Sequence, residues 1–312
     1  MNRTTSAGFL CALVGLFDTS QVTAAVGRTP GAVDISENGE ASYSIPIVAP
    51  PGTHGMTPQL SIVYGHNSGS TLLGAGWSIA GLSAITRCPK SWAADGDVRD
   101  VRNDFSDRFC LDGNKLRLVS GTYGNASATY QTEIETFARV TSFGTAGNGP
   151  ANFVVETKDG LIYEYGSTTD SRIESVGQTT ARAWALNQIR DRSGNAINFI
   201  YAEDTTNGAY RIDLVQYTSN PGQGLTSAYQ IDFVWETKPS NEIDSGYIAN
   251  SKVKQITRLD RVDVKYNTTL VRRYELTYES ALSSTSKSRL ASIQECAGLT
   301  PDCFPATTFS YQ

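Results

Sequence analysis

Apolar and polar residues alternate with a period of two along much of this chain, and this alternation predicts β-strands. In the clearest run, 229–236, Tyr229, Ile231 and Phe233 are separated by mostly polar side chains. Shorter runs of the same kind lie at 43–47, 60–64, 184–189 and 274–278. Successive side chains of a strand point to opposite faces, so the large apolar residues of each run share one face of a sheet.

Turn-forming residues separate these runs at short intervals. The turns include Asp112-Gly113-Asn114, Lys158-Asp159-Gly160 and Asn207-Gly208. Short turns of this composition join antiparallel neighbours. We therefore predict an all-β fold in which antiparallel hairpins follow one another and form a curled sheet.

One segment admits two interpretations. Apolar residues spaced by three from Val253 to Val262 would suit a helix, whereas those from Val262 to Tyr266 alternate. We favour a strand that pairs with 271–278 through a turn near Asn267.

The stretch 43–87 is punctuated by proline and glycine and organises the N-terminal half. Proline lacks a backbone donor, so Pro46 predicts a strand edge or a bulge. Gly74 and Gly76 precede Trp77, and residues without a Cβ allow close backbone approach to the aromatic ring.

Length and charge narrow the possible functions. The 312 residues allow one large β domain or two smaller ones, and the net charge of −5 argues against a basic nucleic-acid-binding surface. No apolar run reaches the roughly 18 residues of a membrane span. We expect neither a nucleic-acid partner nor a stable membrane span.

The first 25 residues have the pattern of a secretory signal peptide. Arg3 is followed by the apolar stretch 7–17 and by small residues that end at Ala24 or Ala25. A buried N-terminal helix is the alternative. We predict export to the extracellular space, with 1–25 as the signal peptide and 26–42 as an N-terminal arm.

Removal of the signal peptide leaves four cysteines, and an even number in an exported chain indicates disulfides. They are Cys88, Cys110, Cys296 and Cys303. Three pairings are possible, and proximity in the sequence favours Cys88–Cys110 with Cys296–Cys303. A zinc site is the weaker alternative, since there is no Cys-x-x-Cys pair and the only histidines are His54 and His66. We expect no metal and no cofactor.

The remaining candidate chemistry is sparse. His54 and His66 lie in predicted loops, which is the usual place of a histidine without a catalytic role, and no Gly-x-Ser-x-Gly motif is present. The segment 95–108 holds five aspartates, but its arginines and the lack of a closing glutamate indicate an ion-paired loop rather than a calcium loop. A disulfide between Cys88 and Cys110 would pin this loop.

Several blocks carry a family resemblance. They are Tyr43-Ser-Ile-Pro-Ile47, Pro50-Pro51-Gly52-Thr53, Pro58-x-Leu60-Ser61-x-x-Tyr64, Leu73-Gly74-x-Gly76-Trp77-Ser78-Ile79 and Ile85-x-Arg87. In this order they resemble the N-terminal domain shared by the SpvB family and the B component of insecticidal toxin complexes. The resemblance implies an SpvB-like β domain over 43–312, with an SpvB-type segment at 43–150.

The second segment, 151–312, resembles the tyrosine- and aspartate-rich repeats of Rhs proteins. The matching residues are Asp159-Gly160-x-x-Tyr163-x-Tyr165-Gly166, Trp184-x-Leu186-x-x-Ile189-x-Asp191-x-x-Gly194-Asn195-x-Ile197 and Tyr201. This resemblance implies hairpins that form part of a hollow shell around a toxic C-terminal segment. In such proteins the chain continues beyond this point, so we expect a C-terminally truncated unit whose last strand, 307–311, is an open edge.

The resemblance also raises the possibility of an ADP-ribosyltransferase. That chemistry needs a Ser-Thr-Ser strand followed by a Glu-x-Glu loop, but here Glu133-x-Glu135 precedes Ser284-Thr285-Ser286. We therefore expect no enzyme activity. The predicted function is a non-catalytic structural module of a secreted toxin, and its partner is the rest of the toxin polypeptide or a companion toxin subunit.

The alternative is a surface or glycan-binding module. Solvent-exposed Trp184 and Trp235 side chains would favour it.

Overall fold

The structure, a computed structural model, describes residues 27–36, 39–279, 286–298 and 302–311. Across these residues nearly all regular structure is β-strand with antiparallel pairing, which confirms the all-β prediction. The helical elements of the described chain are α1 (Trp92–Asp95) and the 3-10 turns at Thr53–Gly55, Pro221–Gln223 and Ser240–Glu242. The predicted signal peptide, 1–25, lies outside the described residues.

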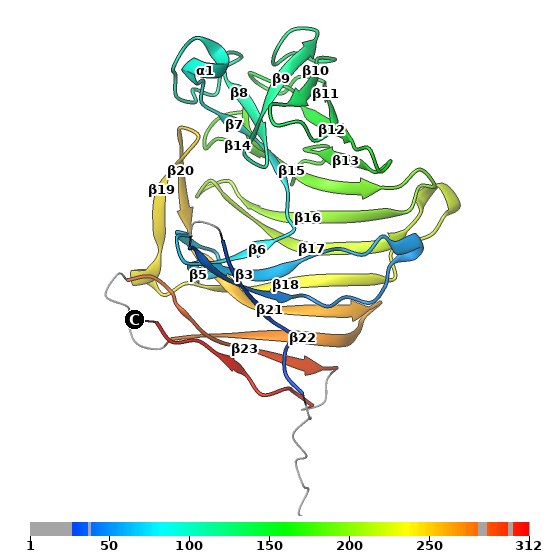
Figure 1. Cartoon of the computed structure of the whole chain (residues 1–312), viewed down its shortest axis with the longest axis vertical. Coiled ribbons are helices and arrows are strands. Elements are labelled where there is room, and N and C mark those ends of the chain that lie inside the picture. The colour runs from blue at the N-terminus through cyan, green and yellow to red at the C-terminus, as the bar shows by residue number, and fades with distance from the viewer. Residues whose placement is uncertain (1–26, 37–38, 280–285, 299–301, 312) are drawn as a thin grey trace, which may run out of the picture.

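Eight strands close into a barrel, which lies at the top of Figure 1. Neighbours in sequence pair from β7 to β13, and β15 closes the ring because it pairs with both β13 and β7. The barrel strands are β7 (Ala84–Cys88), β8 (Arg108–Leu111), β9 (Asn114–Ser120), β10 (Thr129–Thr132), β11 (Arg139–Phe143), β12 (Asn152–Glu156), β13 (Ile162–Tyr165) and β15 (Ala181–Arg190). The short strand β14 (Arg172–Glu174) pairs with the first half of β15.

Strand β15 also begins a second, open sheet that continues below the barrel in Figure 1. The strands of this sheet follow the order β15-β16-β17-β18-β21-β22-β23-β24. Their bounds are β16 (Ala196–Asp204), β17 (Ala209–Ser219), β18 (Tyr229–Thr237), β21 (Thr257–Tyr266), β22 (Thr269–Tyr278), β23 (Leu290–Ala297) and β24 (Thr307–Thr308). These are the hairpins that the alternation predicts, and β24 is the last strand of the sheet.

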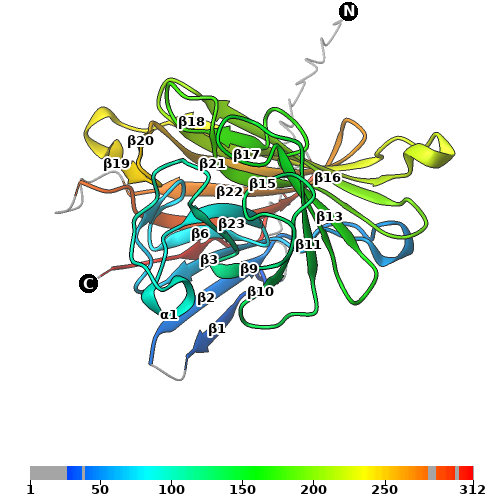
Figure 2. The ribbon, with the colours of Figure 1, turned by 90° about the horizontal axis from the view of Figure 1, so that it is seen from above.

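A four-stranded N-terminal sheet packs across the open sheet, as Figures 1 and 2 show from two directions. Its strands are β1 (Ala32–Ile35), β2 (Ala41–Pro46), β3 (Ser61–Gly65) and β6 (Trp77–Ala80). Buried side chains such as Ile45, Ile62 and Trp77 meet Val215 and Val262 of the open sheet in one core. The burial of apolar faces by both sheets is the main force that holds this sandwich together.

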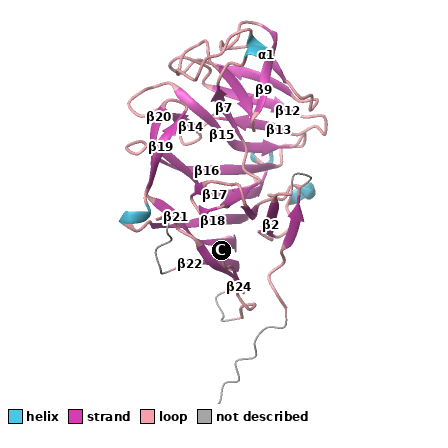
Figure 3. Ribbon diagram, turned by 60° about the vertical axis from the view of Figure 1, so that its left-hand side comes forward, coloured by secondary structure: helices cyan, strands magenta, loops and turns pink. Residues whose placement is uncertain are grey.

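Polar contacts fix the two layers of the sandwich in register. The Tyr217 hydroxyl donates to the Pro50 carbonyl at 2.9 Å, and the Val48 amide donates to the Tyr274 hydroxyl at 2.9 Å. Tyr217 and Tyr274 are fully buried, so an unpaired hydroxyl there would be costly. Two small hairpins complete the structure: β4 (Ser70–Thr71) with β5 (Gly74–Ala75), and β19 (Asp244–Ile248) with β20 (Ser251–Gln255). Figure 3 shows the strands and loops by type.

The local predictions for Pro46 and Asn267 are correct, whereas the one for Gly76 names the wrong ring. Pro46 ends β2 beyond the last residue that pairs with β1, so its missing donor leaves no gap in the sheet. Gly76, at φ +79°, allows a close approach, although the ring it meets is that of Tyr64 rather than Trp77. A Cβ added there would lie 2.4 Å from the Tyr64 ring. The predicted turn at Asn267, with φ +51°, joins β21 to β22.

Two features differ from the sequence interpretation or extend it. Val253 does not belong to the strand that contains Val262, because it lies in the separate β19–β20 hairpin. The pairing of β11 with β12 also crosses residue 150, where the resemblances divide the domain into 43–150 and 151–312. The change from barrel to open sheet occurs at β15.

Candidate functional site

An aromatic cluster fills the barrel and carries a buried arginine. The Phe109 ring packs against Phe153 and Trp184 at centroid distances of 5.3 Å. The guanidinium of Arg87 lies 5.7 Å from the Phe109 centroid and 5.6 Å from the Trp184 centroid. Ile85 and Arg87 are two residues apart on β7, so both face the barrel interior.

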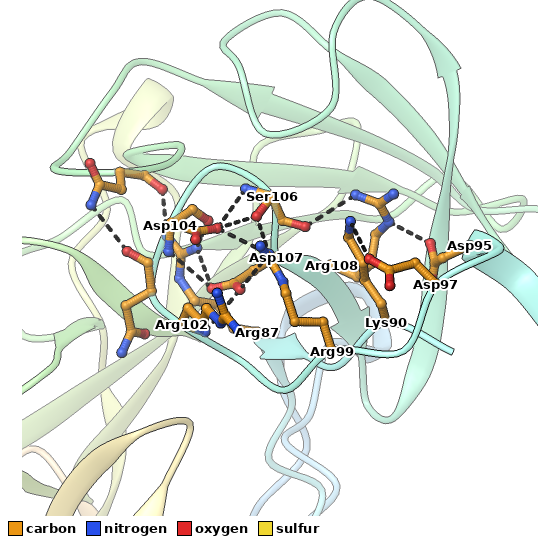
Figure 4. Close-up of polar contacts among 12 residues, drawn as sticks. Arg87, Lys90, Asp95, Asp97, Arg99, Arg102, Asp104, Ser106, Asp107 and Arg108 are labelled. Carbon is orange, nitrogen blue, oxygen red and sulfur yellow. Dashed lines mark hydrogen bonds and ion pairs between the residues drawn. The ribbon is translucent and has the colours of Figure 1, made fainter. Parts of the chain in front are cut away.

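Arg87 is paired on all sides (Figure 4). Its Nη1 donates to a carboxylate oxygen of Asp107 at 3.1 Å, and both side chains are almost completely buried. Its other N–H groups donate to backbone carbonyls of Ala181, Asp104 and Asn148 at 2.6, 2.8 and 2.8 Å. Burial lowers the pKa of Arg87, and the charge of Asp107 opposes that shift. The group therefore ties β7 and β15 to the acidic loop.

The acidic loop 95–108 is ion-paired, as the sequence predicts. Asp95 accepts hydrogen bonds from Arg108 at 2.5 Å and from Lys115 at 2.9 Å. Burial opposes ionisation of Asp95, but the Ser91 amide and these two cations outweigh it and hold its pKa well below the ordinary 3.8. Arg99 pairs with Asp104 at 3.1 Å. Asp95 and Asp104 are thus paired with cations of the same loop or of β9, whereas Asp107 is paired with Arg87 of β7.

Each of the four cysteines is bonded to the cysteine nearest to it in the sequence. Cys88 and Cys110 are joined across β7 and β8, with their Cα atoms 5.9 Å apart. This bond closes the base of the acidic loop. Cys296 and Cys303 are joined between the end of β23 and the segment that leads to β24. The structure therefore has the pairing that sequence proximity favours.

A second ionic cluster lies where the β19 hairpin meets the N-terminal segment. The fully buried Lys238 ammonium donates to Asp244 at 2.8 Å, and the Ser70 hydroxyl donates to the same carboxylate at 2.8 Å. Burial opposes ionisation of Asp244, but these donors and Lys287 lower its pKa. The cluster links Ser70 of β4 to Lys238, which follows β18, and to Asp244 of β19.

The candidate catalytic residues do not converge. His54 lies in the turn after β2, where its side chain is 73% exposed and 3.9 Å from Asp191. His66 is exposed at the end of β3. Glu133 pairs with Arg117 on the outside of the barrel, and Glu135 accepts from the Phe137 amide. Of the Ser-Thr-Ser sequence, 284 and 285 lie outside the described residues. Nothing in this arrangement places a base beside a nucleophile.

Trp184 and Trp235, whose exposure would favour a glycan-binding module, do not form an exposed surface. Trp184 is fully buried and its indole N–H donates to the Pro150 carbonyl at 3.1 Å. Trp235 is partly buried and donates to the Ile212 carbonyl at 2.9 Å. Both rings have structural partners, which disfavours the glycan-binding alternative.

Strands β24 and β1 are edge strands of the described fold. Strand β24 pairs with β23 on one side only. The Phe309 amide donates to the Ala291 carbonyl, so the amide of the preceding Thr308 points away from β23. Strand β1 is exposed at all four residues, including Val33 at 72% and Ile35 at 67%. Such edges are sites where another strand can pair.

Arg87, with its contacts to Asp107 and to three backbone carbonyls, forms a barrel network that the sequence motifs did not single out. The signal was present, because alternation from Ile85 places a charged side chain on the buried face next to an acid-rich loop. A buried charge requires a partner, and the aspartates of 95–108 are the nearest supply.

Comparisons with known proteins agree with this fold. The family model described as SpvB, Salmonella virulence plasmid 65kDa B protein, matches residues 35–230. The crystal structure of TcdB2-TccC3 is similar over 97% of this chain, with a TM-score of 0.75 and 18% sequence identity. The Tc holotoxin pore of Photorhabdus luminescens is similar over 96% of this chain, with a TM-score of 0.74 and 16% identity.

The N-terminal domain of the effector protein SpvB from Salmonella typhimurium strain LT2 is also similar. The match covers 81% of this chain and 99% of that domain, with a TM-score of 0.63 and 17% identity. This chain spans only 18% of the TcdB2-TccC3 chain and 17% of the holotoxin chain. No protein with a curated description matches the sequence. Because the family model covers well over half of the 312 residues, this chain belongs to the SpvB family.

Proposed function

We propose that this chain is a non-catalytic structural module of a secreted, SpvB-like or Tc-like bacterial toxin. In this role it contributes to the shell that encloses or delivers a toxic C-terminal segment. The observation that carries the proposal is the match of 97% of the chain to a portion of the TcdB2-TccC3 chain.

The open sheet supplies a physical means of joining a shell. Thr308 presents an outward amide on the edge strand β24, and its side chain is exposed. Phe309 and Tyr311, by contrast, turn inward and pack against Tyr43, Tyr64 and Trp77. The edge is therefore held by these aromatic side chains while the backbone amide of Thr308 faces outward. The proposed partner, the rest of the toxin polypeptide or a companion subunit, would add a strand here.

Self-association of the isolated mature chain tests this edge. We expect residues 26–312 to form oligomers at high concentration, because an unpaired edge recruits the edge of a second copy. Thr308→Pro should reduce this association, since proline removes the outward donor, whereas Thr308→Ser retains the donor and should behave as the parent. Size-exclusion chromatography with light scattering measures the result. A parent chain that stays monomeric at all concentrations would refute the proposed role of β24.

Export is also part of the proposal. A chain secreted through a signal peptide should begin near residue 25 or 26 when it is recovered outside the cell. Mass spectrometry of the N-terminal peptide distinguishes this from an intact N-terminus, which would argue against the predicted cleavage. In the described residues no helix is long and apolar enough to cross a membrane.

A further inference from the structure

A partly open cavity of about 380 Å³ lies where the three parts of the fold meet. The barrel contributes Ala84 and Ala185, the N-terminal sheet contributes Ile79, and the open sheet contributes Ile212 and Trp235. The volume is in the range of sites for small molecules, and junctions between packed units are common places for such sites. No group described so far in the barrel network or at the β24 edge uses this cavity.

The apolar walls of the cavity are fixed before any ligand arrives. The Tyr201 hydroxyl donates to the Leu186 carbonyl at 2.8 Å, and the Trp235 indole N–H donates to the Ile212 carbonyl at 2.9 Å. Tyr210 packs beside Tyr201 with ring centroids 6.0 Å apart. Each ring is thus held in place by a neighbour, so a ligand would meet a preformed apolar surface.

Two polar groups in the lining lack partners. The Nε of Arg211 and the Oε1 of Gln255 are buried from solvent and make no hydrogen bond within the described residues. The Arg211 guanidinium lies 5.8 Å from the Trp235 ring centroid, and the described part of the chain holds no carboxylate in ion-pair contact with it. Buried donors and acceptors left unpaired are costly, so each is a place where a ligand gains affinity.

The other charged group in the lining is already engaged. The Asp112 carboxylate accepts the Ser83 hydroxyl at 2.7 Å and the Ala84 amide at 2.9 Å, in the turn between β8 and β9. Within the described part of the chain Asp112 has no buried polar atom left unpaired, so Arg211 is the charged group of the lining that has one. Most other arginines of the molecule differ from it, as Arg87, Arg258 and Arg273 each pair with a carboxylate.

We propose that this cavity binds a small organic acid, with its carboxylate on the guanidinium of Arg211 and its apolar body against Trp235 and Ile212. A guanidinium offers two parallel N–H donors to a carboxylate, and Nε is one of the pair. Gln255 would accept a hydrogen bond from a hydroxyl or amide of the ligand. A single arginine in apolar walls suits one carboxylate better than a doubly charged phosphate, which takes more donors. The inference does not depend on the proposed shell function.

The test compares acids with uncharged analogues on the mature chain, residues 26–312. Titration calorimetry with acetate, hexanoate, phenylacetate and indole-3-acetate measures binding, and quenching of tryptophan fluorescence follows the same titration. We expect saturable binding of the larger acids, with 2-phenylethanol at least about tenfold weaker than phenylacetate because it lacks the charge. This comparison needs no variant.

Variants then locate the site. Arg211→Gln should weaken phenylacetate binding about tenfold or more, and Arg211→Lys should retain part of it. The matched control is Arg117→Gln, which changes a 53% exposed arginine outside the cavity and should bind as the parent does. Circular dichroism confirms that each variant is folded. The proposal is overturned if no acid in the panel saturates below about 10 mM, if the alcohol binds as well as the acid, or if folded Arg211→Gln binds like the control.

Discussion

Replacing Arg87 by methionine should destabilise the barrel more than any surface charge change. The Arg87 side chain is 0% exposed. Methionine keeps an unbranched apolar stem in its place but lacks the guanidinium. The change leaves Asp107, itself 1% exposed, without its partner in the barrel. It also leaves the carbonyls of Ala181, Asp104 and Asn148 without the donors that Arg87 supplies.

The magnitude follows from the loss of one member of a buried ion pair. Such a loss costs about 3 to 5 kcal/mol, because the remaining charge stays buried. Asp107 still accepts hydrogen bonds from the amides of Arg102 and Asp104, at 3.0 and 3.2 Å, and lies 3.5 Å from the guanidinium of Arg99, which limits the penalty on that side. Unpaired buried carbonyls add to it, at roughly 1 to 3 kcal/mol each when no water reaches them. We expect a total loss in free energy of unfolding of at least about 3 kcal/mol.

Urea unfolding followed by tryptophan fluorescence measures this loss. Trp184 is fully buried and adjacent to Arg87, so its emission reports on the barrel. The control is Arg117→Met, which removes one member of a surface pair with Glu133 and should cost no more than about 1 kcal/mol. A double-mutant cycle with Asp107→Asn gives the coupling between the two groups. If Arg87→Met costs as little as Arg117→Met, the reasoning that the buried pair holds the barrel to its loop is wrong.

Three further predictions concern acid, disulfides and chemistry. The pKa of Asp95 is lowered in the folded state, so its contribution is fully present above its ordinary pKa of 3.8 and is lost as the pH falls through the lower folded value. Asp95→Asn should therefore flatten the decline of urea stability below pH 3.8, and an unchanged acid profile would contradict this. The two disulfides close loops with sequence separations of 22 and 7. Replacing both cysteines of a pair by serine should therefore lower the free energy of unfolding by about 3 kcal/mol for Cys88–Cys110 and about 2 kcal/mol for Cys296–Cys303. Urea titration measures both losses of stability. Four free thiols in peptide maps of the exported protein would show that the disulfides do not form and would refute this prediction. Finally, residues 26–312 should neither hydrolyse NAD nor modify actin, and turnover of NAD that is abolished by Glu133→Ala or Glu135→Ala would refute the non-catalytic assignment.

Alternation and turn chemistry were enough to predict most strands because both are local properties. The run from Tyr229 to Trp235 and the turn at Asn267 lie where the pattern places them. Closure of the barrel was not predictable in this way. It depends on the pairing of Ile85 with Trp184, which are far apart in the chain. The local sequence around either residue does not specify the other as its partner. The same limit explains the β19–β20 hairpin, since the pairing of Gly246 with Val253 carries only a weak local signal.

The candidate sites show the same division. The acid-rich loop was recognisable from its composition, and the arginines within it were the predicted partners of its aspartates. The cavity that contains Arg211 and Gln255 was not recognisable, because strands from all three parts of the fold must assemble before its walls exist. A half-buried arginine without a carboxylate partner has no signature in a sequence.

The packing of the N-terminal sheet on the last strands also constrains when the molecule can fold. Val48 meets Tyr274 across 226 positions, and the Trp77 indole meets the Tyr311 hydroxyl across 234. A ribosome that has made the first 250 residues has therefore produced strands whose partners do not yet exist. The N-terminal sheet of the growing chain therefore lacks part of its core until Tyr274 and Tyr311 have been made. A sandwich whose two layers come from opposite ends of the sequence is thus completed late, and the apolar faces of its early strands stay uncovered in the meantime.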